Sequence, residues 1–251
     1  MHQILKKITF FFRVKSKKAK IANYVIGGVL LIYLSLLIYP NFFFKYSIKF
    51  KNIRLYSINA FDNNTAKLLS EVSQRLSVST INDTTVTHNV YLCNNFSLYT
   101  FFAPASRNAF GCNYLPFNSI FFASCDVKKN EAYKNDEGDN YIRQLDQVIT
   151  HEITHRLIKE KVGLWKAGSM DMWKNEGYCE TVGYNESYDI VDAKKFLKVY
   201  KNTTGNRVFY RKCYYAVSYL IQIKKMQFED IVKSDLTLDQ VLSEIEKTSI
   251  R

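Results

Sequence analysis

His151-Glu152-Ile153-Thr154-His155, separated by twenty residues from Glu176, is the stretch that decides how this chain folds and what it binds. On one helix, residues i and i+4 project from the same face, so His151 and His155 can hold one Zn²⁺ through neutral imidazole nitrogens. Glu176 offers the third ligand and leaves a fourth position open for water, as a catalytic zinc requires. Glu152 lies one position off the ligand face, where it can accept that water's proton. The spacing predicts one zinc ion per chain.

The sequence around the motif has helical periodicity. Apolar residues recur at three- and four-residue spacing from Tyr141 to Ile153, and Asp136 or Asp139 can cap the start, so we expect a helix over about 139–161. The alternative is a chance match to a short pattern. Against it, the chain has only 4 histidines, and two of them lie in the motif.

A long apolar segment lies near the N-terminus. No charged residue occurs between Ile21 and Tyr39, and the apolar run continues to Phe44, which gives 24 residues where about 20 suffice to cross a bilayer. Seven cations precede this run and four follow closely, which places the N-terminus in the cytoplasm and the rest of the chain outside. A cleaved signal peptide is the alternative. The length of the run and the lack of a small-x-small site favour an uncleaved signal anchor.

The basic charge of the chain comes from this membrane-flanking region. The formal net charge is +12, but residues 62–251 carry 24 Lys and Arg against 23 Asp and Glu. The excess of Lys and Arg therefore indicates the orientation of the chain in a membrane and some affinity for anionic head groups. It argues against a basic surface that binds nucleic acid. We expect the lipid bilayer as a partner, through residues 21–44, and no nucleic acid.

The five cysteines, at positions 93, 112, 125, 179 and 213, have no C-x-x-C spacing. This argues against a thiolate zinc site or a thioredoxin-like motif. In an oxidising compartment up to two disulfides could form, and buried free thiols are the alternative. The sequence leaves both open.

Four regions are predicted: a basic cytoplasmic tail over 1–20, a transmembrane signal anchor over 21–44, a juxtamembrane stalk over 45–61, and an extracytoplasmic domain over 62–251. A first strand is the alternative for the stalk. The predicted domain is α+β, with a small mixed sheet packed on the zinc helix and a mainly α-helical C-terminal half.

The elements of this domain follow from hydrophobic period. We expect a helix over 62–78, then strands over 85–92, 109–114 and 119–124, with 96–102 either strand or short helix. Lys128 to Asn140 is predicted to be a solvated loop or an insertion over the cleft. Later helices are expected over 170–185, 189–202, 206–226 and 237–247, the last capped by Thr237 or Asp235.

Two motifs together resemble those of the gluzincin metallopeptidases: His151-Glu152-Ile153-Thr154-His155, and Trp173-Lys174-Asn175-Glu176-Gly177-Tyr178-Cys179-Glu180. The second motif is similar to that of the aminopeptidase and leukotriene-hydrolase branch and of small peptidase MA-like domains. The resemblance implies a thermolysin-like catalytic core and a peptide or protein substrate. It also implies that Glu180 accepts a ring N–H of a liganding histidine, and that Asn175 supports the ligands or contacts substrate.

Two further stretches resemble this group. Tyr210-Arg211-Lys212-Cys213-Tyr214 falls in the frame of the helix whose tyrosine stabilises the oxyanion, which makes Tyr210 the expected residue, with Tyr214 or Tyr215 as alternatives. Asn108-Ala109-Phe110 is similar to the substrate-pairing edge strand of thermolysin. An internal strand is the alternative reading of this segment.

The amine-binding Gly-x-Met-Glu-Asn pattern of the aminopeptidases has no counterpart before His151. An endopeptidase is therefore favoured, with Glu152 as general base and Tyr210 at the oxyanion. Two other functions stay open: a membrane-tethered zinc-binding module without catalysis, and a zinc hydrolase of a non-peptide amide or ester. The substrate and the oligomeric state are not readable from the sequence.

Overall fold

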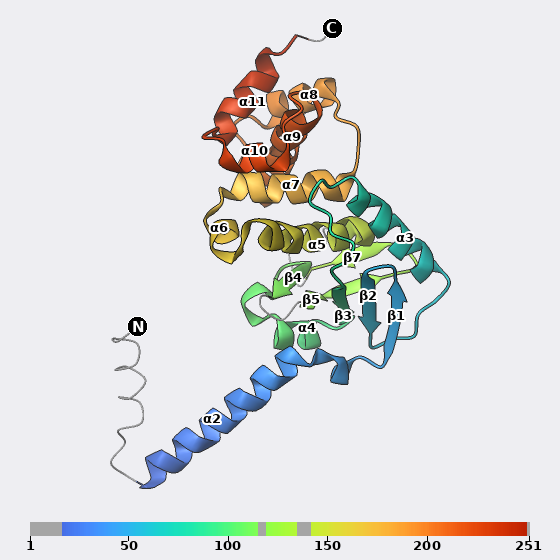
Figure 1. Cartoon of the computed structure of the whole chain (residues 1–251), viewed down its shortest axis with the longest axis vertical. Helices are drawn as coiled ribbons and strands as arrows, with labels where there is room; N and C mark the ends of the chain where they lie inside the picture. Colours follow the sequence, from blue (N-terminus) through green and yellow to red (C-terminus); the bar gives the residue numbers. More distant parts are fainter. Residues whose placement is uncertain (1–16, 115–118, 135–141, 250–251) are drawn as a thin grey trace. The chain divides into compact units, whose positions relative to one another are not determined.

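The computed structural model describes residues 17–114, 119–134 and 142–249 of the chain (Figure 1). It divides into two compact units, Met1–Phe44 and Lys45–Arg251, which are treated separately. The predicted cytoplasmic tail falls mostly outside the described residues, as do Asp136 and Asp139, the capping residues expected for the zinc helix.

The described residues of the first unit form a long helix, α2 (Lys17–Ile38), and a short 3₁₀ turn, η1 (Pro40–Phe43). The 22 residues of α2 are apolar and numerous enough to cross a membrane. The helix starts before the predicted Ile21 and ends before the predicted Phe44. Pro40 explains its end, because proline has no backbone N–H and disfavours helical backbone in the residue before it.

The second unit is built on a mixed sheet with the strand order β1-β2-β3-β5-β4. Its strands are β1 (Tyr46–Phe50), β2 (Ile53–Ser57), β3 (His88–Leu92), β4 (Gly111–Tyr114) and β5 (Ser119–Phe122). β2, β3 and β5 run parallel, whereas β1 and β4 are antiparallel to their neighbours and form the two edges. The fold class is therefore α+β, as predicted.

The segment 45–61 contains β1 and β2 rather than a juxtamembrane stalk, so the alternative prediction of a first strand is the one that agrees with the structure. Ile53 and Leu55 of β2 are fully buried, and β2 pairs with β3 across more than thirty residues of sequence. These strands are stabilised by pairing with each other and with β3. The sequence of a short segment rich in basic and aromatic residues does not predict such pairing. The compact unit accordingly starts at Lys45 rather than at Asp62.

A second sheet of three antiparallel strands, with the order β6-β7-β8, precedes α5 (Leu145–Val162), the helix predicted to bind zinc. It consists of β6 (Ser124–Asp126), β7 (Glu131–Tyr133) and β8 (Ile142–Gln144). β7 lies inside the predicted loop at 128–140, and β8 takes residues expected in the first turn of the zinc helix. Both predictions are corrected here, since three-residue strands with charged side chains leave no alternation of hydrophobicity to detect.

The predicted helices are confirmed to within a few residues, apart from the start of the zinc helix. They are α3 (Asn64–Ser77), α5 (Leu145–Val162), α7 (Met172–Tyr184), α8 (Ile190–Tyr200), α9 (Asn206–Gln222) and α11 (Leu238–Lys247). Thr237 caps α11, as expected. The ambiguous segment is helix α4 (Phe96–Phe102), because the Asn95 side chain accepts hydrogen bonds from two backbone N–H groups of its first turn. Three short elements were not predicted: η2 (Pro104–Ser106), α6 (Leu164–Ser169) and α10 (Phe228–Lys233).

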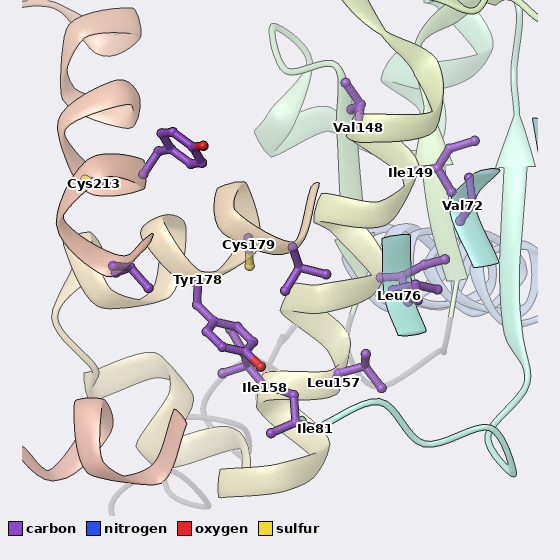
Figure 2. Packing of buried hydrophobic residues seen from close by; sticks show 14 of the residues in the cluster. Val72, Leu76, Ile81, Val148, Ile149, Leu157, Ile158, Tyr178, Cys179 and Cys213 are labelled. Atoms are coloured by element: carbon purple, nitrogen blue, oxygen red, sulfur yellow. The ribbon is translucent and has the colours of Figure 1, made fainter. Parts of the chain in front are cut away.

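Helix α5 is the centre of the core (Figure 2). Val72 and Leu76 of α3 pack near Ile149 of α5 on one side, while Tyr178 and Cys179 of α7 lie on the other. The Arg75 side chain of α3 links α5 to α7. Its Nε donates to Asp146 Oδ2 of α5 at 2.7 Å. Its Nη1 donates to the carbonyl oxygens of Gly183 and Tyr184 at the end of α7. The start of α5 and the end of α7 are thereby held together.

Candidate metal centre

The two motif histidines lie on one face of α5, one helical turn apart. His155 Nε2 is 3.0 Å from His151 Nε2, so both imidazoles point to the same place. Glu176 reaches them from α7, where its Oε2 lies 3.3 Å from His151 Nε2 and 3.4 Å from His155 Nε2. The three residues predicted as ligands are thus brought together.

The spacing of these atoms fits a metal ion. Ligands at 2.0–2.1 Å around a tetrahedral zinc are about 3.3 Å from each other, close to the separations seen here. Glu176 Oε2 is also buried without a well-directed hydrogen bond from any described residue. Buried carboxylate oxygens normally accept at least one hydrogen bond, so this oxygen needs a partner that the described side chains do not provide. A cation between the three ligand atoms would provide it.

Each histidine has a second contact on its other ring nitrogen. Glu180 Oε1 lies 3.0 Å from His151 Nδ1, and Asn175 Oδ1 lies 2.9 Å from His155 Nδ1. Glu180 thus lies close to His151 Nδ1, although this nitrogen has no well-directed hydrogen bond, and Asn175 contacts a histidine rather than the cleft. Such contacts fix the ring orientation and the tautomer that leaves Nε2 free for a metal.

Arg143 of β8 supports the site, and sequence reasoning missed it. Its guanidinium donates two hydrogen bonds to the Glu180 carboxylate, at 3.0 and 2.8 Å. Bidentate pairs of this kind are geometrically specific. No sequence signal identified Arg143, because the residue lies in a segment predicted as the start of the zinc helix.

The buried carboxylates give the site a negative potential. Burial alone lowers the pKa of His151, but Glu180 and Glu176 outweigh this effect and raise it. Burial raises the pKa of Glu180, yet the neighbouring His151 and Arg143 hold it well below its usual range. Burial also raises the pKa of Glu176, but the adjacent His151 and His155 outweigh this effect and lower it, so both carboxylates are ionised and favour a cation between the imidazoles.

Cys179 offers a different ligand set. Ligand atoms of His151, His155 and Cys179 all lie within 4.8 Å of one another, so this group could also hold a metal ion. Cys179 is fully buried on α7, and burial raises the pKa of its thiol far above the usual value. Glu176 Oε2 lies 3.3 and 3.4 Å from the two histidine Nε2 atoms, and this geometry favours Glu176 as the third ligand. All five cysteines are free thiols in the structure.

A cleft of about 1040 Å³ opens beside the histidines. Asn175 is absent from its lining. The other residues predicted to act on substrate are present, together with neighbours from α7 and α9: Asn108, Ala109, Phe110, Gly111, His151, Glu152, Glu180, Tyr184, Arg207, Tyr210 and Arg211. Glu152 faces the edge strand β4, since a Cβ atom built on Gly111 would lie 3.2 Å from Glu152 Cγ. The candidate base and the sheet edge thus share one wall of the cleft.

Tyr210 is the tyrosine of α9 that faces the metal centre. Its ring centroid is 6.4 Å from that of His151, and burial, followed by Glu176, Glu180 and Glu152, raises the pKa of its hydroxyl. A neutral hydroxyl can donate a hydrogen bond. The two alternatives point elsewhere: the Tyr215 hydroxyl donates to Asp192, and the Tyr214 ring packs on Tyr184.

Asn108, Ala109 and Phe110 line the cleft but precede the strand that was expected to contain them, since β4 starts at Gly111. The Phe110 carbonyl accepts a hydrogen bond from the Ala123 backbone N–H at 3.0 Å, so this group is already used within the protein. The predicted strand over 109–114 is therefore two residues too long at its start.

No family model matches the chain, and no curated protein matches its sequence. The chemistry of the site consequently rests on its own geometry.

Proposed function

We propose that this chain is a membrane-anchored zinc metallopeptidase of the gluzincin type. The observation that carries the proposal is the convergence of His151, His155 and Glu176 on one point, with Glu152 and Tyr210 lining the adjoining cleft. A metal site of structural character needs neither an adjacent free carboxylate nor a substrate-sized opening. The mixed sheet, with its antiparallel edge strand β4 beside the zinc helix, supports a thermolysin-like core.

In this proposal His151, His155 and Glu176 hold one Zn²⁺. When bound, the ion lowers the pKa of a water molecule towards about 7 and polarises the substrate carbonyl. Glu152 accepts the proton of the attacking water and delivers a proton to the leaving nitrogen. Tyr210 donates a hydrogen bond to the oxygen on which negative charge develops.

The β4 edge supports an extended peptide as substrate. An edge strand presents unpaired backbone groups that can bind a peptide by strand addition, whatever its side chains. The cleft volume of about 1040 Å³ accommodates several residues. With no amine-binding pattern before the zinc helix, we favour cleavage within chains over removal of N-terminal residues.

The proposed location follows from α2 and its flanking charges. We infer that α2 spans the membrane once, with the N-terminus in the cytoplasm and the peptidase domain in the periplasm or at the cell surface. The two other functions left open by the sequence, a binding module and a hydrolase of non-peptide amides or esters, would use the same site and are separated by the test below.

The test uses the full-length protein in detergent, with zinc and a diverse peptide mixture analysed by mass spectrometry. We expect cleavage by the wild type, and metal retention with loss of cleavage in Glu152→Gln, because the amide cannot accept a proton but keeps the shape. Metal binding without any cleavage in the wild type would support a binding module or a non-peptide hydrolase instead.

A matched pair of variants distinguishes the two ligand sets. Glu176→Ala should lower the zinc content as strongly as His155→Ala does, whereas Cys179→Ala should keep it. Full metal occupancy in Glu176→Ala, together with loss in Cys179→Ala, would replace Glu176 by the thiol and contradict the proposed open site.

A further inference from the structure

An apolar corner projects from the connection between the two helices of the metal centre. Only Ala167 is buried in α6, while Leu164 and Trp165 are 56% and 90% exposed, and Met172 at the start of α7 is 64% exposed. No large apolar side chain in the described part of the chain is more exposed than Trp165. Leu164, Trp165 and Met172 are called the α6 corner below.

No other atoms of the described part of the protein surround the two glycines next to the α6 corner. α5 ends at Gly163 in a positive-φ conformation, and a Cβ atom built there would meet nothing within 4 Å. The same holds at Gly168 within α6. The indole therefore has no surface of its own chain to pack on. Exposed apolar groups gathered in this way are typical of interaction sites.

Charges around the α6 corner favour an anionic partner. Lys166 is exposed and forms no ion pair with a carboxylate of the residues that the structure describes. The neighbouring acids are occupied: Glu160 pairs with Arg156 at 2.8 Å, and Asp171 pairs with Lys174 at 3.0 Å. An exposed tryptophan beside lysine is the composition of membrane interfaces, where the indole sits among head groups and the ammonium meets phosphates.

We propose that the α6 corner docks on a lipid bilayer with anionic head groups. The choice of a bilayer as the partner rests on the membrane anchor in the proposed function. Only Phe44 and Lys45 separate η1, which follows the anchor helix, from β1 of the second unit. Such a short tether keeps the second unit at a high effective concentration next to the bilayer. Three side chains fall short of the roughly 800 Å² per partner that a standard protein interface buries, whereas an indole enters head groups without a shaped partner.

Docking at this place has a consequence for the proposed enzyme. α6 joins α5, which carries both histidines, to α7, which carries Glu176. A contact between α6 and the bilayer would hold the cleft in one orientation at the membrane surface. Substrates located at that surface would then be favoured.

Tryptophan fluorescence tests the proposal directly, because the chain has only 2 tryptophans and α2 has none. Trp173, the other one, is 7% exposed and reports on the core. The full-length protein is reconstituted into vesicles of phosphatidylcholine and phosphatidylserine with brominated acyl chains, which quench nearby indoles. We expect quenching in the wild type that is lost in Trp165→Phe and reduced in Lys166→Ala. Equal quenching of the wild type and Trp165→Phe would overturn the proposal.

Two controls separate this inference from the anchor. Flotation of the vesicles after an alkaline wash measures insertion of α2. If insertion fails, the wild-type protein added to preformed vesicles tests the α6 corner by itself: quenching supports docking, and its absence overturns it. A dimer in detergent that is lost in Trp165→Phe would show that a second copy covers the corner, and would also overturn the proposal.

Discussion

At the scale of single residues, three glutamates of the candidate site have different surroundings and therefore different proposed roles. Glu176 is placed between two imidazoles, Glu180 is held by Arg143 behind His151, and Glu152 faces the cleft. Arg143 holds the carboxylate of Glu180, and the imidazoles of His151 and His155, which can be protonated, lie next to that of Glu176. Glu152 and Glu180 both line the cleft, but Glu180 is only 2% exposed whereas Glu152 is partly exposed, which suits a group that must exchange protons.

Tyr210 offers a test of the proposed chemistry. If its hydroxyl meets the oxyanion only as charge develops, Tyr210→Phe should reduce kcat by about 10²–10³, roughly 2.7–4 kcal/mol, with little change in KM or zinc content. Tyr214→Phe is the control, because its ring packs on Tyr184 away from the histidines. A rate loss in Tyr214→Phe with an active Tyr210→Phe would contradict the placement of α9.

The sequence predicts residues of the candidate site where their spacing along a helix places them on one face. Helix geometry and the need for a third ligand predict that His151, His155 and Glu176 come together, and the structure brings these three side chains together, while their role as metal ligands stays a prediction. Arg143 was not predictable, because its partner is thirty-seven residues away and no pattern connects them. Cys179 was overlooked as a ligand, since the search for thiolate sites considered only C-x-x-C spacing.

At the scale of elements, the site depends on how closely α7 approaches α9. A Cβ atom on Gly177 would lie 2.5 Å from Val217 Cγ2 and 2.6 Å from the Cys213 carbonyl oxygen. Gly177→Ala should therefore force the helices apart and destabilise the protein by about 1–3 kcal/mol, with loss of zinc affinity because Glu176 is adjacent. Chemical denaturation followed by circular dichroism measures the first effect.

Gly168→Ala is the matched control for Gly177, because a Cβ atom at Gly168 meets nothing within 4 Å. This change should leave the stability unchanged or raise it by about 0.4–1 kcal/mol. Equal destabilisation by both substitutions would show that helix contact is not the cause.

Helices were predictable from this sequence and several strands were not. The stripe of Leu68, Leu69 and Val72 repeats with the helical period, so α3 is visible without its neighbours. β2 pairs with β3, more than thirty residues later in the sequence, and that partner is absent from a local window. β8 pairs with the preceding strand β7, but its three residues are too few to have a detectable pattern.

At the scale of the whole molecule, a buried histidine links stability to pH. His88 of β3 is fully buried, and neither ring nitrogen has a hydrogen-bond partner among the residues described. Burial, with a smaller effect of Arg156, lowers the pKa of His88 from 6.5 to about 4 in the folded protein. Above pH 6.5 the ring is neutral in both the folded and unfolded states, so it does not affect the balance between them.

Between these two pKa values the unfolded chain binds a proton that the folded protein does not. The free energy of unfolding should therefore fall as the pH drops from 6.5 to 4, by roughly 3 kcal/mol from this group. Denaturant titrations at several pH values measure the slope. His88→Gln should have a shallower slope than the wild type, and equal slopes would exclude His88 as the source.

The orientation of the chain in the membrane is the other property of the whole molecule. Of the seven cations before the apolar run, Lys17, Lys18 and Lys20 lie within α2 itself, at the end that we place in the cytoplasm. Protease added outside intact cells or spheroplasts should digest the second unit and leave the N-terminal residues protected. Replacing these three lysines by Asn leaves four cations on each side of the run, which removes the bias that sets the orientation, so a protected fraction of the second unit should appear. Replacing Lys49, Lys51 and Arg54 instead should strengthen the bias and leave digestion complete. A second unit that is protected in the wild type until the membrane is opened would reverse the orientation and place the candidate metal centre in the cytoplasm.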